Sequence, residues 1–183
     1  MIDYCQVYNM ESYLFDVVRP RFRVQGYLSA FDFFCIVVWK SNRAKSRIAR
    51  RLLKHDKAGG QDLEGAVRKL TGDLGSETSP KEQLRYLLKE WGFRLPVASA
   101  ILTVLYPDEF TIYDNRVCDS LGEHHNLANL SQFESIWVGY GVFKTHVIEA
   151  TPDGLSQRDK DRYLWGKSFY EQLTSDIGRV FGL

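Results

Sequence analysis

Cysteine is scarce in this chain, and its three residues form no pattern that binds a metal or builds a disulfide framework. Cys5, Cys35 and Cys118 are odd in number, lie far apart and include no CxxC pair. A small fold held together by disulfides is therefore excluded. Three reduced thiols are typical of the cytoplasm, where we expect the protein to reside.

Long apolar runs are also missing. The longest, "FDFFCIVVW", contains Asp32 and is far shorter than the about 18 residues of a membrane-spanning helix. The start, "MIDYCQVYNMESY", lacks the basic, apolar and small-residue order of a signal peptide. We therefore expect no membrane partner. With 183 residues, of which 44% are hydrophobic, the sequence predicts one domain, residues 1–183, with a substantial core.

Motifs of several common enzyme classes are absent as well. GxxxxGK[ST], HExxH and GxSxG do not occur, so no P-loop, zincin or α/β-hydrolase site is indicated. His124 and His125 are adjacent and cannot both face one metal ion as an i, i+4 pair does. His55 and His146 are isolated in the sequence. We expect neither a metal nor another cofactor.

Charge is small in sum but uneven along the chain. The formal net charge is +1, yet residues 17–58 hold 11 Lys or Arg and only two acids, Asp32 and Asp56. The remaining residues hold 13 basic and 21 acidic side chains. This asymmetry predicts one basic face.

A helix predicted over residues 42–55 concentrates that charge. At 100° per residue, its basic side chains gather on one side: Arg43, Arg47, Arg50, Arg51 and Lys54. The opposite side is apolar, and no acid is interleaved among the bases. Two interpretations stay open, a solvated charged face and a surface that contacts phosphates.

The hydrophobic period is helical almost throughout, which predicts an all-α fold of roughly seven to nine helices. Cap signals at Ser29, Ser79 and Ser156 begin three of them. The predicted helices cover about residues 30–40, 42–55, 62–70, 80–91, 96–105, 115–121, 132–149 and 157–173. Residues 1–28 are expected to be irregular, because Pro20 argues against a helix. The stretch "TGDLGSETSP" has the composition of a flexible connection.

The stretch "GFRLPVASAILTVLYPDEFTIYDNRV" raises the question of function. A turn at Gly92 joins two helices, and such a turn either presents N–H groups to a phosphate or is an ordinary helix corner. Further along, "TIY" is expected to be extended and "NRVCDSLG" to form a short helix that ends at Gly122. Asp114 then stands at the N-cap, where the helix dipole favours an ionised carboxylate. It is either a plain capping residue or a catalytic one.

The combination resembles the helix-hairpin-helix (HhH-GPD) DNA glycosylase superfamily, and most closely its adenine glycosylase and endonuclease III-like branches. Their hairpin reads LPGVGxxTA, and their catalytic aspartate lies in an FPIxDxNV-like context. Gly92, Ala98 and Asp114 fall in the same register without a gap. The resemblance is specific over about 35 residues, 88–122, and looser elsewhere.

This resemblance implies a monofunctional enzyme of base excision repair that hydrolyses the N-glycosidic bond of a flipped-out base. Asp114 would be the catalytic residue that stabilises an oxocarbenium-like state. The expected contacts with duplex DNA come from the hairpin, from the "WKSNR" corner that matches the family's groove-reading loop, and from the basic helix: Gly92, Phe93, Arg94, Leu95, Lys40, Ser41, Arg43, Arg47, Arg50 and Arg51. Trp39 and Tyr113 would flank a base pocket, unless they are core residues.

Two departures bear on this expectation. Arg94 replaces the second hairpin glycine, so it is strained if that position needs a positive φ. Pro96 occupies the position at which bifunctional members carry a nucleophilic lysine, and the four-cysteine iron–sulfur signature is missing. The alternative is a non-catalytic helical module that binds DNA or a protein in a repair or defence system.

Overall fold

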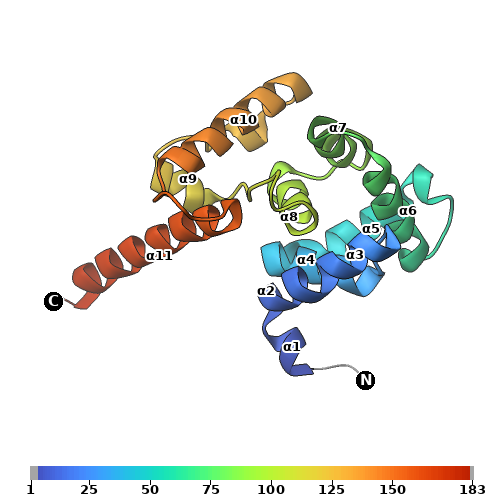
Figure 1. Ribbon diagram of the computed structural model, residues 1–183, viewed down its shortest axis with the longest axis horizontal. Coiled ribbons are helices and arrows are strands. Elements are labelled where there is room, and N and C mark those ends of the chain that lie inside the picture. The colour runs from blue at the N-terminus through green and yellow to red at the C-terminus, as the bar shows by residue number, and fades with distance from the viewer. Residues whose placement is uncertain (1–3, 182–183) are drawn as a thin grey trace. The chain divides into compact units, whose positions relative to one another are not determined.

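A computed structural model describes residues 4–181, and in this range the protein consists of helices and loops without a strand. The predicted all-α class is thus confirmed (Figure 1). Nine α-helices in the described range have six or more residues, as expected from the sequence. No helix between residues 4 and 181 has both the length and the apolar character needed to cross a bilayer.

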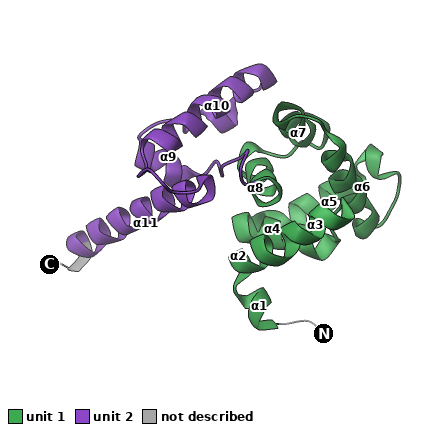
Figure 2. Ribbon diagram, in the orientation of Figure 1, with its two compact units in different colours: residues 1–106 green, residues 107–183 purple. Residues whose placement is uncertain are grey.

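The chain divides into two compact units, residues 1–106 and residues 107–183, where the sequence led us to expect one domain (Figure 2). The first unit contains α1 (Tyr4–Tyr8), α2 (Met10–Tyr13), α3 (Arg19–Gln25), α4 (Ala30–Ser41), α5 (Lys45–Lys54), α6 (Leu63–Ser76), α7 (Pro80–Arg85) and α8 (Leu95–Leu105). The second contains α9 (Asn115–Leu121), α10 (Phe133–Glu149) and α11 (Gln157–Phe181).

The core of the first unit is built around α4 and α8, which pack against each other. Both are apolar nearly all round, which is typical of buried central helices. Phe33 and Ile36 of α4 are fully buried, as are Ala98, Ala100 and Ile101 of α8. The small residues of α8 let neighbouring helices approach closely.

The expectation of an irregular N-terminal segment is wrong for residues 4–25, which are helical apart from a bend at Asn9, while residues 1–3 lie outside the described range. A π-helical turn, Leu14–Val18, joins α2 to α3 without a break. In this turn the Arg19 N–H donates to the Leu14 carbonyl, one residue further back than in an α-helix. Pro20 follows this turn, whose irregular hydrogen-bond pattern accommodates its missing N–H. Leu14, Val18 and Phe22 are buried at four-residue spacing, and this is the helical signal in the sequence.

Helix α6 is longer than predicted and passes through most of "TGDLGSETSP", which is therefore not a flexible connection up to Ser76. Thr71 explains part of this, because its hydroxyl accepts from the Leu28 N–H at 2.9 Å and donates to the Val67 carbonyl. Gly75 explains another part. A Cβ at that position would lie 3.3 Å from the Gly26 carbonyl oxygen, so glycine permits a close backbone approach.

A buried carboxylate ties three N-terminal helices together. The Asp32 N–H donates to the hydroxyl of Ser29, which caps the N-terminus of α4 as predicted from the sequence. The Asp32 side chain is fully buried and accepts from the Tyr13 hydroxyl and from the Arg21 guanidinium, both at 2.7 Å. Burial and the nearby carboxylate raise the pKa of Tyr13 to about 12.

In the second unit, α10 buries one apolar face. The side chains buried on this face are Phe133, Ile136, Tyr140, Phe143 and Val147. Helix α9 packs along α11, which begins with the predicted capping box at Ser156 and Asp159. Helix α11 continues to Phe181, eight residues past the predicted end at Leu173.

Candidate functional site

The hairpin turn in the first unit places its positive φ on glycine. Gly92 has φ 65°, and the following Phe93 N–H donates to the Leu87 carbonyl at 2.9 Å. Arg94 is extended, with φ −82° and ψ 151°, and directly precedes α8. The strain that a second hairpin glycine would have avoided therefore does not arise at Arg94.

The hairpin residues named from the sequence separate into two groups. The side chains of Phe93 and Leu95 are buried, and the Phe93 N–H is already bonded within the turn. A phosphate contact through that N–H is incompatible with this geometry, because the Leu87 carbonyl occupies it. Gly92 and Arg94 are exposed and remain candidates for a backbone contact.

The basic helix α5 is fastened to this turn. The Arg51 guanidinium donates to the Gly92 carbonyl. One turn later, His55 stacks on Trp91 with ring centroids 4.2 Å apart and places its Nε2 2.7 Å from the Glu90 carbonyl. The Lys57 N–H donates to His55 Nδ1 at 3.2 Å, so both contacts fit the neutral Nε2–H tautomer. These contacts hold the C-terminal end of α5 against the hairpin turn.

The rest of the basic face of α5 is exposed and not paired with acids. Its members are Arg47, Arg50 and Lys54 of α5, together with Arg43 of the 3₁₀ turn, Asn42–Ala44, that precedes the helix. None of the four has a carboxylate partner within the described part of the chain. Helix α6 shows the contrast, because Arg68 pairs with Glu64 and Lys69 with Asp73 at i, i+4 spacing. Unpaired exposed cations are the arrangement that attracts a polyanion.

The "WKSNR" corner lies at the end of α4. Lys40 and Ser41 are half-buried, and a 3₁₀ turn, Asn42–Ala44, leads directly into α5. Trp39 is half-buried and makes an edge-on contact with Phe15, with ring centroids 6.1 Å apart. Lys40 and Ser41 thus belong to a tight helical corner that continues into the basic helix.

In the second unit, Asp114 occupies the predicted N-cap. Its backbone is extended, and its Oδ1 accepts from the Arg116 N–H at 2.9 Å. Helix α9 ends at Gly122 in the left-handed conformation, as predicted. The Asp114 side chain is half-buried, so its carboxylate is neither sealed in the core nor fully surrounded by water.

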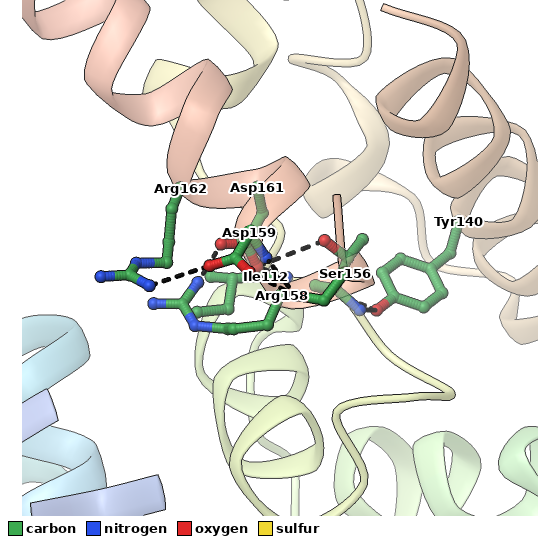
Figure 3. A network of polar contacts seen from close by, with 8 residues as sticks. Ile112, Tyr140, Ser156, Arg158, Asp159, Asp161 and Arg162 are labelled. Atoms are coloured by element: carbon green, nitrogen blue, oxygen red, sulfur yellow. Dashed lines mark hydrogen bonds and ion pairs between the residues drawn. The ribbon is translucent and has the colours of Figure 1, made fainter. Parts of the chain in front are cut away.

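A buried polar network fixes the extended segment that leads to Asp114. The Tyr140 hydroxyl donates to the Thr111 carbonyl at 2.6 Å and accepts from the Thr111 N–H at 3.1 Å. Asp161 Oδ2 accepts from the Ile112 N–H at 3.2 Å and from the Thr111 hydroxyl at 3.3 Å, while its Oδ1 pairs with Arg158 (Figure 3). Backbone groups that lack helix partners are satisfied by side chains of α10 and α11.

The same network extends to the start of α11. Asp159 accepts from Arg162 at 2.9 Å and from the Ser156 hydroxyl at 2.7 Å (Figure 3). These hydrogen bonds, first the one from Ser156 and then the one from Arg162, lower the pKa of Asp159. These contacts order the start of α11, and Asp161 of the same helix holds the segment that leads to Asp114.

Tyr113 does not line a pocket. It is 1% exposed, packs edge-on against Phe143 and donates its hydroxyl to the His124 carbonyl at 2.7 Å. Burial raises its pKa to about 12. The alternative that Tyr113 is a core residue therefore holds in this structure, because its ring has no open face for a base.

An aromatic pair on α11 that contacts Arg116 was not found from the sequence. Trp165 and Phe169 of α11 stack with ring centroids 5.7 Å apart, and each is 44% exposed. The Arg116 guanidinium lies 5.2 Å from the Trp165 ring centre and donates to Gln172 at 2.9 Å. Their i, i+4 spacing was the available signal, but it did not reveal that α9 would supply a cation.

A scan against models of protein families and searches of curated proteins and of solved structures each returned no match to this chain. Inferences about function therefore rest on the geometry above and on the residues that carry the sequence resemblance. Fold class alone does not determine activity, so the carboxylate and the basic face have to be tested as sites.

The hydroxyl of Tyr140 is expected to stabilise the second unit. Tyr140→Phe leaves the buried N–H and carbonyl of Thr111 without their shared partner, which costs about 1–3 kcal/mol of unfolding free energy. Urea denaturation measures the loss. The matched control is Tyr170→Phe, whose side chain is 71% exposed and whose substitution should change stability little. Equal effects of the two substitutions would contradict a stabilising role for the hydrogen bonds between Tyr140 and Thr111.

Arg51 is expected to stabilise the hairpin turn. Arg51→Ala removes the hydrogen bond to the Gly92 carbonyl, worth about 1 kcal/mol, and should speed amide exchange in residues 91–94 about fivefold. Hydrogen–deuterium exchange with mass spectrometry reads this directly. Arg50→Ala removes a neighbouring exposed cation and should leave the turn unchanged. Identical exchange in both variants would show that Arg51 does not hold the turn.

Proposed function

We propose that the protein is a monofunctional DNA N-glycosylase that removes a damaged or modified base from a flipped-out nucleotide. The observation that carries the proposal is the position of Asp114 at the N-cap of α9, at the end of an extended segment that buried side chains fix. A carboxylate held in one place is what an oxocarbenium-like transition state requires.

The chemistry follows from the charge that develops on the sugar. As the C1′–N bond lengthens, its electron pair moves to the base, and positive charge grows on C1′ and the ring oxygen. Ionised Asp114 stabilises this charge and accepts a proton from the attacking water, whose oxygen bonds to C1′. The departing base takes up a proton from solvent, and Asp114 returns the proton it accepted to solvent, so that the elements of water are added across the C1′–N bond. The Arg116 N–H donates to Asp114 Oδ1 and holds the carboxylate at the start of α9.

Hydrolysis is favoured over lyase chemistry by the residue at position 96. The bifunctional glycosylases that the sequence resembles form a Schiff base through a lysine at the corresponding position. Pro96 has no amine, and it lies in the first turn of α8. A single-step displacement by water is therefore the proposed reaction.

The first unit supplies features suited to binding the DNA backbone. Arg47 and Arg50 of α5, and Arg43 of the turn before it, are exposed and have no carboxylate partner within the described chain. Arg51 fastens α5 to the hairpin. Contacts of this kind position a duplex without reading its sequence. In the second unit, Trp165 and Phe169 offer stacked, partly exposed rings on which an unstacked base can rest.

The fixed basic surface also favours a second candidate function, a non-catalytic DNA-binding module. The bond from Arg51 to the Gly92 carbonyl holds the basic helix and the hairpin turn together by contacts that do not involve Asp114. Binding and catalysis can therefore be separated by substitution.

Asp114→Asn is expected to abolish cleavage and to spare binding. The neutral amide keeps the shape of the side chain but cannot stabilise a cationic sugar, so the rate of base release should fall at least about a hundredfold. The assay incubates duplexes that carry a panel of damaged or modified bases and reveals abasic sites with alkali.

The matched control is Asp119→Asn, an exposed aspartate of the same helix whose carboxylate contacts His125 at 2.8 Å. It should cleave as the unsubstituted protein does. Cleavage that survives in Asp114→Asn would refute the proposed role of Asp114. Duplex binding without cleavage of any substrate would favour the non-catalytic module.

The basic face is expected to contribute to binding through counterion release. Replacing Arg47 and Arg50 together with Ala should weaken binding equally for all sequences and reduce the slope of log K against log salt by up to about two units. Fluorescence anisotropy at several salt concentrations measures the slope. The control removes two cations that are paired with acids, Arg68 and Lys69. Equal slopes for both double variants would mean that the face of α5 is only solvated.

A further inference from the structure

Three side chains of metal-ligand type meet at one point in the second unit. His124 Nε2 lies 2.9 Å from His146 Nδ1 and 3.4 Å from Glu123 Oε1, and His146 Nδ1 is in direct contact with the same Glu123 oxygen. All three atoms lie within 4.8 Å of one another. His146 was isolated in the sequence, and α10 brings it to the loop that follows α9. We propose that Glu123, His124 and His146 bind a divalent transition-metal ion, with zinc as the best fit.

The contacts among the three atoms leave lone pairs facing one another. If His146 Nδ1 carries a proton, that proton is shared between Glu123 and His124, and the His124 lone pair still faces the carboxylate oxygen. If His124 Nε2 carries the proton instead, the His146 lone pair faces Glu123. A single proton thus satisfies only part of the cluster. A divalent cation accepts all three lone pairs at once.

The loop backbone holds His124 in an unusual conformation. His124 has φ 72°, and it is the one non-glycine residue with positive φ in the described range. Such a conformation costs free energy and tends to persist where a function needs it. Here the His124 carbonyl accepts from the Leu127 N–H at 3.0 Å and from the Tyr113 hydroxyl at 2.7 Å. The edge contact with Phe143 orients the ring.

The three ligand atoms indicate which metal ion fits the site best. Two imidazole nitrogens and one carboxylate oxygen form a His₂Glu set, which suits zinc and leaves a fourth position for water. Two nitrogens on tetrahedral zinc lie about 3.3 Å apart, so binding requires the rings to separate by about 0.4 Å. The side chain of His124 is 11% exposed, that of His146 33% and that of Glu123 49%, so an ion can enter from solvent.

Bound metal would link two elements of the second unit. Glu123 and His124 follow α9, and His146 lies on α10, three residues after Phe143. Because the ligands converge only in the folded chain, zinc should raise thermal stability. This inference does not depend on glycosylase activity.

The test uses the untagged full-length protein after removal of metal with EDTA. Zinc is titrated against a chromogenic chelator, and we expect one equivalent to bind and to raise Tm. Cobalt should give the visible absorption of a four-coordinate site. His146→Ala should lower zinc affinity about a hundredfold, and Glu123→Gln, an exposed change that preserves the fold, should also lower it.

The matched control is His125→Ala. This histidine is adjacent to the site but contacts Asp119 through its Nε2 at 2.8 Å, so its loss should not change zinc binding. Two results would overturn the proposal. One is a protein that takes up no zinc at micromolar concentration. The other is equal zinc affinity in His146→Ala, Glu123→Gln and His125→Ala, which would locate bound zinc elsewhere.

Discussion

The extended segment Phe110–Asp114 has backbone N–H and carbonyl groups that no helix satisfies, and burying them would be costly without other partners. Tyr140 and Asp161 provide those partners, and Arg158 balances the buried charge of Asp161. These hydrogen bonds fix where α9 begins. They thereby determine where the Asp114 carboxylate is held, and the proposed chemistry depends on that position.

The two units have different chemical characters, which match the two tasks of the proposed enzyme. The first carries a helix whose exposed cations lack acidic partners in the described chain and whose position Arg51 fixes against the hairpin turn. The second carries a carboxylate at a helix N-cap, a stacked aromatic pair and a cluster of metal-ligand side chains. Binding of the DNA phosphate backbone needs only positive charge in a fixed position. Cleavage of the N-glycosidic bond needs one carboxylate held in one orientation.

Local signals allowed much of the fold to be predicted. The caps at Ser29, Ser79 and Asp114 depend on residues two or three positions away, and the structure confirms each of them. Pro20 misled the prediction, because its tolerance depends on a π-helical turn that no propensity scale describes. The end of α6 was missed because Thr71 and Gly75 owe their effects to Leu28 and Gly26, which are distant in sequence.

The candidate site also combines features that depend on neighbouring residues with features that depend on contacts between residues distant in sequence. The position of Asp114 followed from its own neighbourhood in the sequence. The bond from Arg51 to Gly92 and the approach of His146 to His124 join residues 41 and 22 positions apart, so only the packed structure reveals them. Tyr113 was ambiguous for the same reason, since its burial depends on Phe143 of another helix.

The most direct test of the central claim is a crystal structure with duplex DNA in which a cationic pyrrolidine replaces the sugar of the target nucleotide. This ring carries positive charge where the transition state develops it. The account predicts that the Asp114 carboxylate lies within hydrogen-bond distance of the ring nitrogen and that the basic face of α5 contacts phosphates. A bound duplex whose pyrrolidine lies remote from Asp114 would contradict it.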